Sequence, residues 1–145
     1  CPYVHHINDR LVSVANSYIN KGISFIAISS NDATQYPEDS PEKMADVVRS
    51  QHYPFPYLYD ESQSVAKSYK AACTPDFYFF DKQLKLYYRG QFDSSRPGNE
   101  VEVTGKCLTD AIDGYLRGVP APAIQIPSIG CSIKWKVGNE PDYFL

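Results

Sequence analysis

The chain begins with a cysteine followed by a proline, and this pair is the first candidate for chemistry. The stretch CPYVHHI leads into apolar residues at helical spacing, which predicts a helix with Cys1 at its N-cap and Pro2 at its first position. A helix N-terminus carries partial positive charge and unpaired N–H groups, which stabilise a thiolate relative to a thiol. A protonated His5 on the same helix face would add to this effect. Cys1 is therefore suited to be a nucleophile, the alternative being an inert residue.

The second candidate is the pair Thr74–Pro75, which stands directly before the apolar run DFYFF. A proline next to a strand is expected only at the first residue or at an edge. A cis Thr74–Pro75 bond would present the Thr74 backbone as an unpaired strand edge, able to hydrogen-bond an extended substrate. A trans proline would only punctuate a loop.

Three further cysteines leave their roles open. The chain has four cysteines and no CxxC pair, so it lacks zinc-ribbon spacing. Cys73 precedes Thr74 and is either a resolving partner for Cys1 or a small buried residue. Cys131 lies in the tail segment GCSIKWK, where it either reaches Cys1 or Cys73 as a mobile resolving thiol or packs. Cys107 continues the inward stripe of a predicted helix and is expected in the core.

These residues must be positioned by alternating helices and strands. The pattern predicts an α/β fold with parallel strands, flanking helices and a C-terminal β-hairpin as an antiparallel edge. We expect a domain over residues 1–118 and an extended tail over 119–145 that packs on it. The predicted elements are a helix ending at Lys21–Gly22, a strand over 23–30 covered on both faces, a helix from Pro41 capped by Ser40, a short strand over 56–60, a helix after an Asp60–Gln63 capping box, a hairpin of 76–80 with 84–90, and a helix from Thr104 to Gly118.

Several of these segments together resemble a known family. CPYVHHI, NDATQYPEDSPEKM, FPYLYDESQSVAKSY, AACTPDFYFFD, YYRGQFDSSRPGN and PSIGCSIKWK are similar to the thioredoxin-like redoxin proteins of the AhpC/TSA group. Such proteins usually carry Cys-Asn-His-Cys-Pro-Tyr-Val-Lys-His-Ile after an apolar strand. The sequence starts at the second cysteine of that motif and has His5 in place of lysine. We therefore expect a longer protein, with a first central strand that is missing from this sequence.

The resemblance implies a thioredoxin-like fold in which Pro75 is a cis-proline facing the active-site helix. It leaves two roles open for Cys1. The residue matches the buried, resolving cysteine of a thioredoxin-type CxxC, and it also matches the peroxidatic cysteine of peroxiredoxins, whose motif has threonine three residues earlier.

The predicted function is that of a thiol–disulfide oxidoreductase in cell redox homeostasis. Cys1 would be one half of the redox centre, and Thr74 and Pro75 would form the substrate platform. One alternative is a peroxiredoxin-like thiol peroxidase, and another is a non-catalytic thioredoxin-fold module that binds a partner peptide at the Thr74–Pro75 edge.

The expected partners follow from this chemistry and from the composition. We expect a disulfide-containing protein or a peroxide as substrate, a thiol reductant, and no cofactor or metal. The net charge is −3 and no basic stripe is present, which argues against nucleic acid. No apolar run reaches the roughly 20 residues of a membrane helix. We expect a cytoplasmic protein and leave a homo-oligomer open.

Overall fold

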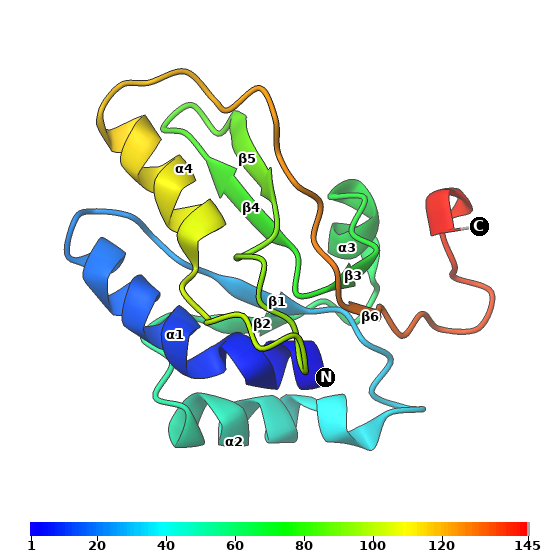
Figure 1. Ribbon diagram of the computed structural model, residues 1–145. Helices are drawn as coiled ribbons and strands as arrows, with labels where there is room; N and C mark the ends of the chain where they lie inside the picture. The colour runs from blue at the N-terminus through cyan, green and yellow to red at the C-terminus, as the bar shows by residue number, and fades with distance from the viewer. Residues whose placement is uncertain (145) are drawn as a thin grey trace. The chain divides into compact units, whose positions relative to one another are not determined.

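Helices and strands alternate along the chain, as the sequence predicts. The computed structural model describes residues 1–144. Its elements are α1 (Pro2–Ile19), β1 (Ala27–Ser29), the 3-10 turn η1 (Pro37–Asp39), α2 (Pro41–Ser50), β2 (Tyr57–Tyr59), α3 (Ser64–Ser68), β3 (Cys73–Thr74), β4 (Phe77–Phe80), β5 (Leu86–Gly90), α4 (Lys106–Leu116), β6 (Cys131–Ser132) and the 3-10 turn η2 (Asp142–Phe144) (Figure 1). No helix among the described residues combines the length and the apolar character that crossing a membrane requires.

The described residues form two compact units. One unit, here called the site unit, contains residues 1–11 and 73–131, and the second unit contains residues 12–72 and the described residues from 132 onward. The predicted division into a domain over 1–118 and a tail from residue 119 stays a prediction.

The predicted hairpin is the centre of the site unit. β4 and β5 pair antiparallel, with Phe77 opposite Gly90 and Tyr78 opposite Arg89. The turn is closed by Asp81, whose carboxylate accepts backbone hydrogen bonds from Gln83 and Lys85 at 2.8 and 2.9 Å. α4 lies beside β5 (Figure 1). The rings that pack edge to face between the hairpin and α4 are those of Phe79, Tyr87 and Tyr115.

α4 begins later than predicted. Its N-cap is Gly105 rather than Thr104, and the Thr104 hydroxyl only accepts a hydrogen bond from the Lys106 N–H at 3.3 Å. Gly105 has a φ of +71°, a conformation that side chains disfavour, and a Cβ at this position would collide with the ring of Phe92. The glycine therefore sets the start of the helix.

After α4, the chain returns alongside β5 before it reaches β6 (Figure 1). The Arg89 N–H donates to the side-chain oxygen of Gln125 at 2.8 Å, and the Gln91 N–H donates to the carbonyl of Ile126 at 2.9 Å. β6 then pairs with β3 in a two-stranded sheet. The segment is anchored beside β5 by its own backbone and amide groups.

In the second unit, β1 and β2 form a parallel pair in which Ile28 lies opposite Leu58. The prediction of a strand over 23–30 covered on both faces is wrong. Only Ala27–Ser29 is a strand, because the register with β2 extends over those residues alone. Ile26, Ile28 and Leu58 are 61%, 43% and 49% exposed. Within the described residues, β1 has β2 as its only sheet partner.

In the second unit, the N-termini of α2 and α3 are capped in different ways. α2 begins as predicted, because the Ser40 hydroxyl accepts a hydrogen bond from the Lys43 N–H at 3.4 Å and Pro41 takes the first position. The predicted Asp60–Gln63 capping box is wrong. Gln63 adopts a φ of +63° as N-cap of α3 and makes no side-chain cap, while the Asp60 carboxylate accepts from the Ala66 N–H at 3.0 Å.

Candidate active site

Cys1 stands at the positive end of α1. Its carbonyl accepts the first hydrogen bonds of the helix, from the N–H groups of Val4 and His5, both at 3.1 Å. Pro2 occupies the first helical position, where its missing N–H costs no hydrogen bond. Cys1 is an exposed residue with a free thiol. His5 is also exposed.

The structure brings Cys1 to the predicted Thr74–Pro75 pair. The Cys1 Sγ lies 3.5 Å from the Thr74 carbonyl oxygen, and the Thr74 hydroxyl donates to the same sulfur at 3.4 Å. The Thr74–Pro75 peptide bond is cis. A hydroxyl donor directed at a sulfur stabilises negative charge on it. The helix end and the Thr74 hydroxyl therefore favour a thiolate on Cys1, while the Thr74 carbonyl oxygen opposes it.

A second sulfur lies at the same point. The Sγ atoms of Cys1 and Cys131 are 2.7 Å apart, although the two residues are 130 positions apart in the sequence. Both are free thiols, and Cys131 is half-buried. Of the two partners that the sequence left open for Cys131, the structure places Cys1 in contact.

One edge of the strand at Thr74, which the sequence predicts to be unpaired, is paired in the structure. β3 pairs with β6, so the backbone next to Pro75 already has a strand beside it. Gly130, the residue before β6, packs directly on the Thr74–Pro75 peptide, where a Cβ would overlap the Thr74 carbonyl oxygen. The sequence does not predict this contact, because the only sequence feature that points to it is the glycine before Cys131.

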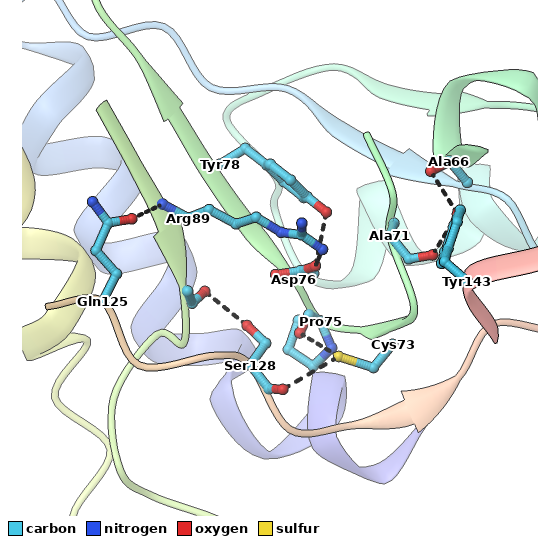
Figure 2. A network of polar contacts seen from close by, with 11 residues as sticks. Ala66, Ala71, Cys73, Pro75, Asp76, Tyr78, Arg89, Gln125, Ser128 and Tyr143 are labelled. Atoms are coloured by element: carbon cyan, nitrogen blue, oxygen red, sulfur yellow. Dashed lines mark hydrogen bonds and ion pairs between the residues drawn. The ribbon is translucent and has the colours of Figure 1, made fainter. Parts of the chain in front are cut away.

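Cys73 is directed away from Cys1. Neighbouring residues of a strand point to opposite faces, and the Cys73 sulfur contacts the carbonyls of Pro75 and Ser128 at 3.8 and 3.7 Å (Figure 2). Burial raises the pKa of the Cys73 thiol to about 11, and the nearby Asp76 carboxylate adds to the rise. At neutral pH this thiol is protonated.

Asp76 is the centre of a polar cluster around Cys73. Its carboxylate accepts from the Tyr78 hydroxyl at 2.8 Å and from the Arg89 guanidinium at 3.3 Å (Figure 2). Burial, together with the Asp76 hydrogen bond and charge, raises the pKa of Tyr78. The Ser128 hydroxyl donates to the Gly90 carbonyl at 2.7 Å and so holds the tail segment beside this cluster.

In the site unit, a loop over residues 91–104 contacts α1. The Asp93 carboxylate accepts from the N–H groups of Ser95, Thr104 and Gly105 at 2.9, 2.8 and 2.6 Å. The Arg96 guanidinium donates to the carbonyls of Asp93 and Ser95, both at 2.7 Å. The turn residues of DSSRPGN signal a loop, but they do not indicate that one buried carboxylate organises it.

His6 connects α1 to that loop. Its Nε2 lies 2.5 Å from the Ser95 hydroxyl, which in turn donates to the Val101 carbonyl at 2.8 Å. Because the single hydroxyl proton is used on Val101, His6 Nε2 must be the donor. Ser95 is thus a structural hydroxyl rather than an activated nucleophile. A cavity of about 20 Å³ lies between His6 and Pro75, with room for one water.

Cys107, predicted to lie in the core, is partly buried. The Gln91 side-chain amide donates to its sulfur at 3.3 Å, and its own N–H donates to the Phe92 carbonyl. Its neighbours in α4, Leu108, Ala111 and Ile112, are buried.

The chain belongs to the AhpC/TSA family, which it matches over residues 1–89. It is therefore a redoxin-group protein of thioredoxin-like type. An uncharacterized conserved protein from Geobacillus kaustophilus is 62% identical, with a TM-score of 0.92 over 94% of this chain and 72% of that one.

A hypothetical protein from Sinorhizobium meliloti 1021 is 48% identical, with a TM-score of 0.93 over 95% of this chain and 75% of that one. A comparison with curated proteins finds no match. Family membership indicates thiol redox chemistry, while the similar structures carry no activity in their descriptions.

Proposed function

We propose that the protein is a thiol–disulfide oxidoreductase whose nucleophile is Cys1. The observation that carries the proposal is the placement of one free thiol at the N-terminus of α1, with its sulfur within hydrogen-bonding distance of the Thr74 hydroxyl. Both features stabilise the thiolate, which is the form that attacks a disulfide. Membership of the AhpC/TSA family supports the same class of chemistry.

In the proposed reaction, the Cys1 thiolate attacks one sulfur of a substrate disulfide. A mixed disulfide forms between Cys1 and that sulfur, and the other sulfur leaves as a thiolate that takes a proton from solvent. A second thiol then attacks the Cys1 sulfur and releases the rest of the substrate. Thr74 holds the Cys1 sulfur in position through its hydroxyl.

The platform role of Thr74 and Pro75 stays a prediction. An extended peptide can pair with β3 only if it displaces β6 or approaches from another side. The same fact limits a non-catalytic module that binds peptides here to the edge of β3 that β6 does not occupy. An exposed, hydrogen-bonded thiol favours catalysis over simple binding.

The test compares two activities of the full chain. Reduced protein is supplied with a dithiol reductant, and the rate of insulin disulfide reduction is measured beside the rate of hydroperoxide consumption. We expect insulin reduction that falls to the buffer rate in Cys1→Ser and is unchanged in Cys107→Ser. Peroxide consumption without insulin reduction would instead support the peroxidase alternative, and insulin reduction that survives Cys1→Ser would refute the assignment of Cys1.

A further inference from the structure

Resting on the proposed role of Cys1, we propose that Cys131 is the second thiol of the redox couple, and that β6 presents it to Cys1 as an extended substrate would present its own cysteine. The contact that carries this proposal is the 2.7 Å separation of the two Sγ atoms. A disulfide bond is about 2.05 Å long, so bond formation requires a movement of roughly 0.7 Å.

The tail is held where this contact requires it. Gly130 lies against the Thr74–Pro75 peptide, and only a residue without a Cβ fits there. On the same stretch, the Ser128 hydroxyl binds the Gly90 carbonyl at 2.7 Å, and the Ile126 carbonyl binds the Gln91 N–H at 2.9 Å. These contacts direct the chain along β5 and deliver Cys131 beside Thr74.

The other two cysteines are less suited to this role. Cys73 points to the opposite face of β3, where its sulfur contacts two carbonyls, and its raised pKa leaves little thiolate at neutral pH. The Cys107 sulfur accepts a hydrogen bond from Gln91 at the start of α4. Cys131 is the cysteine whose sulfur contacts that of Cys1.

The proposed step balances without a cofactor. After Cys1 has attacked a disulfide R–S–S–R′ and released R′–SH, the Cys131 thiolate attacks the Cys1 sulfur. The Cys1–Cys131 bond forms, the Cys1–S–R bond breaks, and R–SH leaves with a proton. The protein gives up two electrons and two protons from its thiols, and the substrate disulfide becomes two thiols.

Trypsin separates the four cysteines for the test. Cleavage after arginine and lysine places Cys1 in peptide 1–10, Cys73 in 71–82, Cys107 in 107–117 and Cys131 in 118–134. The reduced full chain is incubated with glutathione disulfide at mildly alkaline pH, quenched in acid, and analysed by intact mass and by non-reducing digestion. We expect peptides 1–10 and 118–134 to be joined by a disulfide, with little glutathione retained on the protein.

Two variants isolate the second thiol. Cys131→Ser should retain one glutathione on Cys1, because nothing then resolves the mixed disulfide. Cys107→Ser is the matched control and should form the Cys1–Cys131 link as the unchanged chain does. Circular dichroism checks that both variants are folded. The cross-link in the unchanged chain is measured directly and does not depend on any variant.

The outcomes distinguish this inference from the proposed function. Glutathione that stays on Cys1 of the unchanged chain as stably as on Cys131→Ser, or a link from Cys1 to peptide 71–82, would refute the role of Cys131 and leave Cys1 as the nucleophile. A Cys1 that takes no glutathione and forms no link in any variant would refute the proposed function and the inference together.

Discussion

Four cysteines in one chain differ mainly in what surrounds each sulfur. Cys1 is an exposed residue whose sulfur has a helix N-terminus, a hydroxyl donor and one carbonyl oxygen beside it. Cys73 has carbonyl oxygens and a nearby carboxylate, which oppose negative charge. The same side chain is therefore expected to be reactive in one place and inert in another, and both expectations can be tested by substitution of a neighbour.

The first prediction concerns Thr74→Val, which removes the hydroxyl and keeps the shape. We expect iodoacetamide to label Cys1 about tenfold more slowly at pH 7, because a hydrogen bond to a charged group contributes about 1.5–3 kcal/mol when it is well formed and less when it is exposed. At high pH, where every thiol is ionised, the rates should converge. Thr109→Val in α4 is the control, and equal labelling in all three proteins at pH 7 would contradict the role of Thr74.

The second prediction concerns Asp76→Asn. The Asp76 carboxylate helps to raise the pKa of Cys73, while the Arg89 charge lowers it. Removal of the carboxylate should therefore lower the Cys73 pKa below about 11 and speed its labelling between pH 8 and 10. Labelling of peptide 71–82 across this range measures the change, with Asp110→Asn, an exposed partner of Lys106, as control. An unchanged or higher pKa would contradict the contribution of the Asp76 carboxylate.

At the scale of elements, the site depends on two strands of two residues each. β3 and β6 are too short to show a pattern, and their pairing joins residues far apart in the sequence. Their positions depend on the tail contacts with β5 and on the close approach of Gly130 to Thr74. Substitutions at these contacts should therefore disturb the positions of Cys131 and Thr74, although the substituted residues lie outside β3 and β6.

Gly130→Ala is the third prediction. A Cβ would overlap the Thr74 carbonyl oxygen, so the tail must shift, at a cost of about 1–3 kcal/mol in the free energy of unfolding. The shift should also slow the proposed Cys1–Cys131 disulfide. Gly114→Ala in α4 is the matched control. The nearest atom to its Cβ would be the Tyr87 hydroxyl oxygen at 3.3 Å, so a small side-chain adjustment is enough there. Urea unfolding and the tryptic map measure both effects, and two glycines that respond alike would contradict the account.

The elements with clear periodicity could be predicted from the sequence. α1, the Ser40 cap of α2 and the β4–β5 hairpin each follow from a local pattern of apolar, capping or turn residues. β1 is shorter than predicted because a strand extends only as far as its partner does, and a sequence pattern does not show the partner.

The site was predicted in part. Cys1 and Thr74 lie together as the family resemblance implies. The contact between Cys1 and Cys131 depends on the path of the tail, and the His6–Ser95 bond depends on a loop folded around a buried carboxylate. Neither follows from local spacing, because each joins residues that only the tertiary structure brings together.

At the scale of the whole molecule, the proposed disulfide would link positions 1 and 131 of the chain. A cross-link between residues so far apart reduces the conformational entropy of the unfolded chain. The fourth prediction is that the oxidised protein is more stable to urea than the reduced protein by about 2–4 kcal/mol. Cys131→Ser should show no such difference between oxidising and reducing buffer, and equal stabilities of the oxidised and reduced unchanged chain would contradict the link.

The central claim is that the environment of Cys1 makes its sulfur the reactive thiol of the protein. The most direct test is competitive labelling of the reduced chain at pH 7 with less iodoacetamide than total thiol, followed by quantification of the four tryptic cysteine peptides. The account predicts that peptide 1–10 is labelled first and that 71–82 is labelled last. Labelling in which 71–82 or 107–117 leads, or in which all four peptides react equally, would contradict it.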